Sequence, residues 1–152
     1  MAKFAASGVS GALTTTLKSA VGIGQPSSSL KGPLAVYTVV LGSTDTTTDA
    51  NIEWTAQLYS SAGTSTAVTP TDVEDYGDTA IATAGQTYTA EPTVVSNTVL
   101  FDMGLNQRAT YTLVMGPGYE WKVKPTASRN LTLAAKHPSA TPKVSGVLFW
   151  TE

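Results

Sequence analysis

Apolar and polar residues alternate along most of the chain that follows residue 33. In NIEWTAQLY (residues 51–59) every second residue from Ile52 to Leu58 is apolar, while Glu, Thr, Gln and Tyr stand at the positions between and after them. Successive side chains of a β-strand point to opposite faces of the sheet. The period of two therefore predicts a strand with one buried and one exposed face.

Further strand-like segments are separated by runs rich in Gly, Pro, Ser, Thr and Asp. TYTLVM and YEWKVK flank the short connection GPG at 116–118, which predicts a β-hairpin made of residues 109–115 and 119–124. Eight or nine short strands without a long helix predict an all-β fold, either an antiparallel β-sandwich or a jelly roll. The other expected strands are 34–42, 93–102, 129–135 and 143–151, with weaker ones over 64–68, 79–83 and 86–90.

The first 33 residues lack this regular pattern. They are small and flexible and contain the breaker-rich run GIGQPSSSLKGP, which predicts an extended N-terminal arm over 1–33 ahead of a domain over 34–152. Leu13, Leu17 and Val21 have helical spacing, so a short amphipathic helix is an alternative for part of the arm, although LTTTL is a poor helix former.

The last expected strand, 143–151, is apolar on both faces. Leu148 and Trp150 fall on one face, and Val147 and Phe149 fall on the other. Such a strand is expected at the centre of a sheet or at a subunit contact. Burial of each aromatic side chain would then stabilise the domain by roughly 2–3 kcal/mol.

The composition supports β structure and excludes several kinds of site. Only 13% of the residues are charged, while 25 are Thr and 14 are Ser, and the β-branched Thr is better accommodated in strands than in helices. The chain has no Cys, which excludes disulfides, thiolate metal sites and a thiol nucleophile. The apolar runs are far shorter than the roughly 20 residues of a membrane helix, and Gly, Ser and Thr interrupt the N-terminal segment, so we expect neither a membrane partner nor an export signal.

Charges are distributed in blocks. Residues 1–31 hold three lysines and no acid, residues 32–107 hold nine acids and no Lys or Arg, and the remainder holds six basic and two acidic residues. The blocks can meet within one folded chain or between copies of it, and the pattern alone leaves both possibilities open.

The residues offer little for catalysis. His137 is the one histidine, and it lies in the breaker-rich AKHPSA, where a preorganised base is not expected. Ser139 lies in the same loop without the glycine elbow of a hydrolase nucleophile. We therefore expect a surface histidine, no catalytic residues, no cofactor and no enzymatic activity.

One acidic segment, TDVEDYGD, is a candidate interface or ion site. It places Asp72, Glu74, Asp75 and Asp78 within seven residues, and Ca²⁺ prefers several oxygen ligands. The spacing does not match an EF-hand loop, and a solvated acidic loop is the alternative.

Two further ligand classes receive limited support. Three lysines without interleaved aromatic residues or arginines would bind nucleic acid weakly, so no specific nucleic-acid partner is expected. Tyrosines in loops, such as Tyr76 and Tyr88, could stack on sugars, whereas Trp54, Trp121 and Trp150 occupy expected inward positions.

The strand-rich segments LAVYTVVLGSTDTTTDANIEWTAQLYSS and YEWKVKPTASRNLTLAAKHPSATPKVSGVLFWTE, together with the Gly/Ser/Thr/Ala-rich beginning, resemble small all-β virion proteins of tailed bacteriophages. The resemblance covers about residues 34–152 and is greatest to capsid decoration, or cement, proteins. It is one of style and strand order, without a diagnostic capsid-binding motif. It implies a β-sandwich or jelly-roll domain that forms homotrimers and binds the outer surface of the assembled capsid.

This resemblance sets the functional expectations. The partners would be the major capsid protein and further copies of the chain, and the protein would be made in the bacterial cytoplasm and reside on the virion. A head-fibre, tail or receptor- or carbohydrate-binding role is the alternative. The arm is expected to clamp the shell or a neighbouring copy and to stabilise the capsid, with Lys3, Leu13, Leu17, Lys18 and Lys31 as its candidate contact residues.

Overall fold

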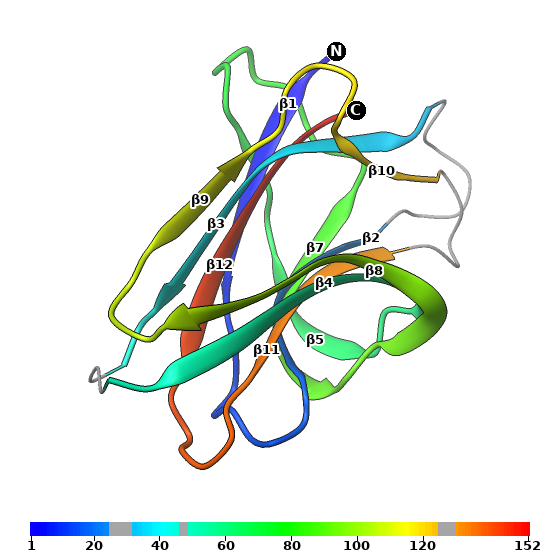
Figure 1. Ribbon diagram of the computed structural model, residues 1–152. Helices are drawn as coiled ribbons and strands as arrows, with labels where there is room; N and C mark the ends of the chain where they lie inside the picture. The colour runs from blue at the N-terminus through cyan, green and yellow to red at the C-terminus, as the bar shows by residue number, and fades with distance from the viewer. Residues whose placement is uncertain (25–31, 46–48, 125–129) are drawn as a thin grey trace.

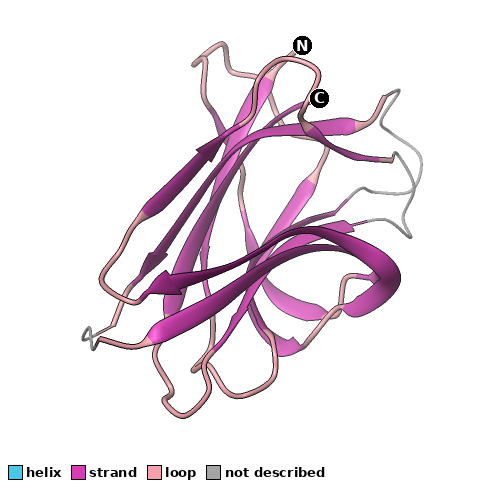
Figure 2. Ribbon diagram, in the orientation of Figure 1, coloured by secondary structure: helices cyan, strands magenta, loops and turns pink. Residues whose placement is uncertain are grey.

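The computed structural model describes residues 1–24, 32–45, 49–124 and 130–152, and these residues form strands and no helix (Figure 2). The strands are β1 (Lys3–Val9), β2 (Lys18–Gly24), β3 (Leu34–Ser43), β4 (Asn51–Ser61), β5 (Thr64–Val68), β6 (Thr71–Asp72), β7 (Thr83–Ala90), β8 (Thr93–Asn106), β9 (Tyr111–Val114), β10 (Trp121–Val123), β11 (Asn130–Lys136) and β12 (Val144–Thr151).

The strands form two antiparallel sheets that pack face to face (Figure 1). Sheet A has the order β10-β3-β12-β1-β6, with β9 also paired to β3, and sheet B has the order β5-β7-β2-β11-β4-β8. One hydrophobic core lies between them and includes Trp54, Leu133 and Trp150. The expected all-β sandwich is therefore confirmed.

The predicted arm is wrong for residues 1–24. β1 pairs with β12 and β6, while β2 pairs with β11 and β7, so each strand lies inside a different sheet. Phe4 is 1% exposed and Val21 is 0% exposed. Small residues gave these strands a weak hydrophobic signal, but alternate residues of KFAASGV are nevertheless buried. The amphipathic helix is also wrong, because Val21 belongs to β2.

The predicted central position of the C-terminal strand is confirmed, but only its Leu148 and Trp150 face is fully buried, while Val147 and Phe149 on the other face are half buried. β12 lies between β1 and β3, and the Trp150 ring packs 6.1 Å from that of Phe4, measured between ring centroids. The chain end is held as well, since Glu152 exchanges backbone hydrogen bonds with Ala2 and its carboxylate accepts hydrogen bonds from the amides of Ile81 and Ala82.

The predicted hairpin of 109–115 and 119–124 is wrong. β9 pairs with Thr38–Leu41 and β10 pairs with Leu34–Val36, both antiparallel to β3. Two strands antiparallel to the same neighbour run in the same direction, so they cannot form a hairpin with each other. They form two consecutive parts of one edge. Tyr119, which was expected to begin the second strand of the hairpin, lies in the loop between them and is 81% exposed.

The other predicted strands differ mainly in their ends. β3, β4, β5, β11 and β12 lie where strands were expected, and β8 extends four residues beyond the expected end at 102. Residues 79–82 form no strand, and the two expected strands 79–83 and 86–90 are replaced by the single strand β7.

Candidate interaction surface

One side of the sandwich leaves part of its core half exposed, and we call this side the open flank. It lies where β8, the last strand of sheet B, faces β9 and β10 on the last edge of sheet A (Figure 1). Their inward side chains pack against the core but are only partly buried, in contrast to the core residues further inside. The open flank consists of Phe101, Leu105, Tyr111, Leu113, Met115 and Trp121.

Strand register explains which side chains belong to the open flank. Phe101 lies opposite Ala56 on β4, and Tyr111 and Leu113 lie opposite Leu41 and Val39 on β3. These partners are buried, so the flank residues continue the inner faces of both sheets by one strand. They remain half exposed because they lie on edge strands, where no further strand of the described chain covers them.

Aromatic rings connect the two sheets across the open flank. The centroid of the Phe101 ring lies 6.3 Å from that of Tyr111 and 6.2 Å from that of Trp121. Distances of this size are typical of favourable aromatic pairs. The contacts join the two edges, and the three rings remain partly exposed to solvent.

The edges beside the open flank carry additional exposed apolar side chains. Val99 is 51% exposed and Leu100 is 39% exposed on β8, and Val114 on β9 is 70% exposed. β8 has 14 residues and pairs with β4 only, so its other edge has backbone groups without a strand partner in the described chain. A long unpaired edge with apolar side chains is a template for pairing with another chain.

The charge blocks meet within the folded chain. All four ion pairs between described residues join an acid of the 32–107 block to a base outside it. Two of them use Lys3 and Lys18, which were expected to contact a partner. The pairs are Lys3–Glu74 at 2.6 Å, Lys18–Glu91 at 3.7 Å, Arg108–Asp49 at 3.1 Å and Lys136–Glu53 at 2.7 Å.

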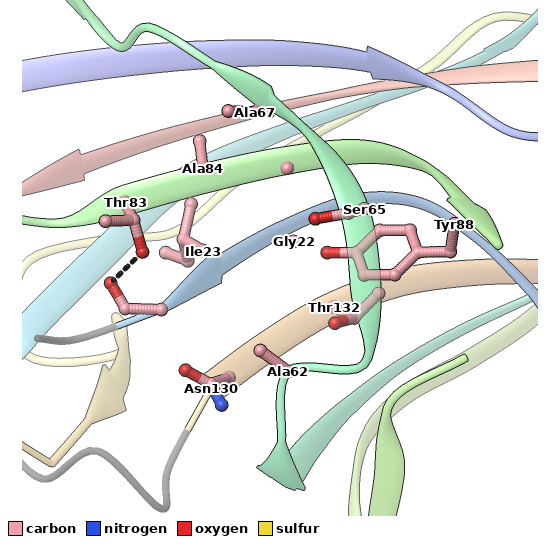
Figure 3. A pocket seen from close by; sticks show the side chains of 12 residues that line it. Gly22, Ile23, Ala62, Ser65, Ala67, Thr83, Ala84, Tyr88, Asn130 and Thr132 are labelled. Carbon is pink, nitrogen blue, oxygen red and sulfur yellow. Dashed lines mark hydrogen bonds between the residues drawn. The ribbon is translucent and has the colours of Figure 1, made fainter. Parts of the chain in front are cut away.

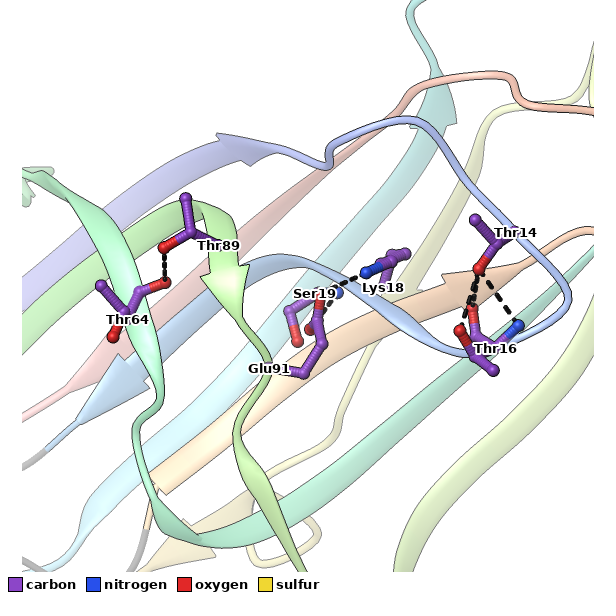
Figure 4. A network of polar contacts seen from close by, with 7 residues as sticks. All are labelled: Thr14, Thr16, Lys18, Ser19, Thr64, Thr89 and Glu91. Carbon is purple, nitrogen blue, oxygen red and sulfur yellow. Dashed lines mark hydrogen bonds and ion pairs between the residues drawn. The ribbon is translucent and has the colours of Figure 1, made fainter.

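The other residues proposed as arm contacts also lie within the sandwich where the structure describes them. Leu13 is fully buried in the connection between β1 and β2, where its amide donates a hydrogen bond to the carbonyl of Pro142. Leu17 is half buried, and Lys31 lies outside the described residues. Lys18 and Ser19 contact Glu91, whose carboxylate accepts a hydrogen bond from the Ser19 amide at 2.9 Å (Figure 4). Leu13, Lys18 and Ser19 therefore make contacts within the sandwich and do not belong to an arm that projects from it.

The acidic segment is organised around Asp72. Its carboxylate accepts hydrogen bonds from the backbone amides of Glu74, Tyr76 and Asp78 at 2.9–3.1 Å. These bonds, led by that from Glu74, hold the pKa of the Asp72 carboxyl below its usual range. The Glu74 carboxylate forms an ion pair with Lys3, and Asp75 adopts a left-handed backbone conformation with a φ of 54°. The segment therefore uses its main carboxylate to shape a loop, and no cluster of three or more His, Cys, Asp or Glu suited to a metal ion occurs in the described part of the chain.

His137 is buried, so the expectation of a surface histidine is wrong. The side chain is 2% exposed, and its Nδ1 accepts hydrogen bonds from the amides of Ser139 and Ala140 at 3.2 and 2.7 Å. An Nδ1 that accepts hydrogen bonds carries no proton, which places the proton of the neutral ring on Nε2. The imidazole thereby shapes the turn before β12. Ser139 contacts it through its backbone amide, so this contact does not make a nucleophile and base pair.

The aromatic residues considered for sugar binding occupy different environments. Trp54 and Trp150 are buried, as expected, while Trp121 is half buried at the open flank. Tyr76 is 79% exposed beside the acidic segment. Tyr88 lies against the outer face of sheet B and lines a cavity there.

Among the described residues, no helix has the length and apolarity required to cross a membrane. Comparison of the chain with known protein families, with curated proteins and with solved structures found no match.

Proposed function

We propose that the protein is a structural virion protein that binds the outer surface of an assembled bacteriophage capsid and stabilises it, as decoration proteins do. The open flank is the observation that carries the proposal. It combines half-exposed aromatic and aliphatic side chains with two strand edges that no described strand covers. Apolar patches of this kind mark sites of protein association.

The charged and titratable side chains contact one another and the backbone of the fold, and this favours a binding role for the protein. Acids and bases pair with each other within the fold, Asp72 shapes a loop, and His137 accepts hydrogen bonds from backbone amides. These contacts stiffen the scaffold on which the flank is built. A rigid scaffold lowers the conformational entropy that is lost when a surface docks.

The proposal places the capsid contact on the open flank and not on an N-terminal arm. β1 and β2 are interior strands, and their removal from the sandwich to reach a shell would expose Phe4 and Val21. The flank, in contrast, docks without unfolding. An extended apolar segment of the major capsid protein is the partner we propose, because it can pair with the free edge of β8 and cover Phe101 and Trp121.

Association of copies on the shell is a further part of the proposal. The free edges of β8 and of β9–β10 belong to different sheets, so a contact between them in neighbouring copies would be head to tail. Head-to-tail contacts close into rings when the rotation between copies allows it, and a trimer is one such ring.

Co-purification with particles tests the capsid role. The chain would be produced together with the major capsid protein encoded in the same genome, and particles would be separated on a density gradient. We expect the wild-type chain to band with the particles and to raise their melting temperature. Leu100→Lys places a charge on the β8 edge and should abolish banding without unfolding the chain, because Leu100 is already 39% exposed.

A matched control lies on the other edge of the sandwich. Val73 follows β6 and is 45% exposed, so Val73→Lys makes a comparable chemical change at similar exposure. It should leave banding unchanged. Wild-type chain that stays at the top of the gradient contradicts the capsid role, and equal loss in both variants contradicts the assignment to the open flank.

A further inference from the structure

A cavity of about 190 Å³ opens on the outer face of sheet B, at the end of the sheet away from β8 (Figure 3). Strands β2, β7 and β11 form its base, and the segment from Ala62 through β5 passes in front of them. This volume is too large for one ordered water and smaller than the range of about 300–1,000 Å³ for drug-sized ligands. A small molecule with a single ring matches it.

Two glycines allow polar side chains to approach the base of the cavity closely. A Cβ atom at Gly22 would clash with the phenol oxygen of Tyr88, and one at Gly85 would clash with the hydroxyl of Ser65. The Tyr88 hydroxyl therefore lies close to the backbone of the sheet, next to the hydroxyls of Ser65 and Thr132. Burial raises the pKa of this phenol, so it is a neutral hydroxyl at physiological pH.

An irregularity in β7 places Tyr88 on this face. Gly85 lies on the outer face opposite Gly22, and strict alternation would send the side chain three residues later to the inner face. Thr87 adopts a φ of 47°, a left-handed conformation that is rare for a β-branched residue, and the register with β5 shifts at the same point. Strain of this kind is retained where the surrounding structure requires it, often at ligand sites.

Asn130 supplies a second, independent sign of a ligand. The residue is only 6% exposed and lines the cavity, yet its Nδ2 atom has no hydrogen-bond partner among the described residues. Buried amide groups are almost always paired, so an acceptor is expected at this site.

The chemistry of the lining identifies the ligand class. None of the lining residues is charged, and five of them carry polar side chains that donate or accept hydrogen bonds: Ser65, Thr83, Tyr88, Asn130 and Thr132. A charged ligand would have no counter-charge in the cavity. The Tyr88 hydroxyl bonds to those of Ser65 and Thr132, and Thr83 bonds to the carbonyl of Gly24, so the group that an apolar ligand would leave unpaired is the Nδ2 donor of Asn130. A ligand with hydroxyl groups offers an acceptor to this donor and can join the existing hydroxyl network. We propose that the cavity binds a neutral, hydroxyl-rich ring, namely a monosaccharide or the terminal sugar of a glycan.

The cavity and the open flank can be occupied at the same time. The cavity is built on β5, β7, β2 and β11, whereas the flank begins at β8 on the far edge of sheet B. A chain bound to a partner through its flank would still present the cavity. The sugar site therefore goes beyond the capsid role and does not depend on it.

Saturation-transfer NMR on the full chain tests the site directly. The probes are glucose, galactose, mannose and N-acetylglucosamine at millimolar concentration, each alongside its methyl glycoside. We expect signal transfer to at least one of these sugars. Binding of the methyl glycoside indicates the end of a glycan, and binding of the free sugar alone indicates a free monosaccharide.

Two variants locate the binding. Ala62→Trp fills the cavity from an exposed position, and Thr132→Val removes one hydroxyl with little change of shape. Each should weaken binding at least about tenfold, which corresponds to roughly 1.4 kcal/mol. Ala109→Trp and Thr112→Val make the same changes at exposed positions near the open flank and should bind as the wild type does.

Two results would overturn the proposal. One is the absence of signal transfer to all of the sugars, and the other is undiminished binding by Ala62→Trp. Because these measurements use the isolated chain, they are independent of the gradient experiment, and either proposal can fail without the other.

Discussion

The middle of the sandwich and its open flank are built from the same alternating pattern but differ in how completely they are covered. In the middle, Phe4, Leu148 and Trp150 are at most 1% exposed, because strands flank them within the sheet and the opposite sheet covers them. At the flank, Phe101 and Trp121 meet across the two sheets but lie on edge strands and stay half exposed. Comparison of the two regions shows that the position of a strand in its sheet decides whether an apolar row becomes core or surface.

The strongest test of this comparison removes interior strands. Deletion of residues 1–24 takes β1 and β2 out of two different sheets, so we expect loss of the folded state, whereas a detachable arm would leave the domain intact. Circular dichroism and a thermal melt check this. A truncated chain that melts cooperatively near the wild-type temperature would contradict the interior position of these strands.

A smaller effect comes from a single aromatic side chain in each region. Trp150→Ala should lower the free energy of unfolding by about 3–5 kcal/mol, because it leaves a cavity among fully buried neighbours. Trp121→Ala at the open flank should cost clearly less, since water already reaches that side chain. Urea denaturation of both variants measures the difference, and equal costs would show that the flank is as well covered as the middle.

High pH probes the outer face of sheet B, where Tyr59 is 3% exposed although it lies outside the core between the sheets. Burial, with the nearby Glu91 and Tyr88, raises the pKa of Tyr59 to about 12 from an ordinary value of 10.0. The neutral phenol is therefore favoured by folding. Its contribution to stability is complete below pH 10 and is lost as the pH rises from 10 towards 12. The loss amounts to roughly 1.4 kcal/mol for each pH unit in that window.

Thermal melts of the wild type and of Tyr59→Phe, recorded from about pH 8 to about pH 12, would separate this effect from other alkaline changes. The wild type should lose more stability than the variant over this range. Parallel curves would mean that the Tyr59 phenol ionises as readily in the folded chain as in the unfolded chain.

The smallest expected effect concerns the cross-strand ion pair between Lys136 and Glu53. The two side chains are 37% and 43% exposed, and such pairs contribute about 0.2–1 kcal/mol. Glu53→Gln should therefore lower stability slightly in dilute buffer and not at all in high salt, where the charges are screened. Urea denaturation at two salt concentrations checks this. If Glu53→Gln lowered the free energy of unfolding as much as Trp121→Ala does, the exposed ion pair would contribute as much stability as the packing of Trp121, which would contradict this expectation.

Period-two patterns in the sequence were sufficient to predict most strands beyond residue 33 and the two-sheet class. They also predicted that β12 lies at the centre of a sheet or at a subunit contact, and the structure places it at the centre of sheet A, with Val147 and Phe149 on its outer face half buried. They missed β1 and β2, whose Ala, Gly and Ser residues gave a weak hydrophobic signal. The alternation in KFAASGV, which buries Phe4 and Ala6, was the available clue.

The candidate surfaces were harder to predict than the strands. Phe101, Tyr111 and Trp121 have the same local pattern as core residues, and nothing in their immediate sequence indicates that they lie on edge strands. The acidic run was visible, but its role as a loop stabiliser depends on three backbone amides that turn towards Asp72. The cavity beside Tyr88 depends on the irregularity at Thr87, which alternation cannot anticipate.

The sequence by itself determined where apolar residues alternate with polar ones and that most of these segments form strands, since alternation and β-branching act over a few neighbouring residues. Only the tertiary structure decided the order of strands in each sheet, and with it the pairing of the charge blocks within one chain, the open flank and the cavity on sheet B. These features depend on contacts between residues far apart in the chain. A local pattern indicates whether a segment favours a strand, but it does not indicate which distant strand will lie beside that segment.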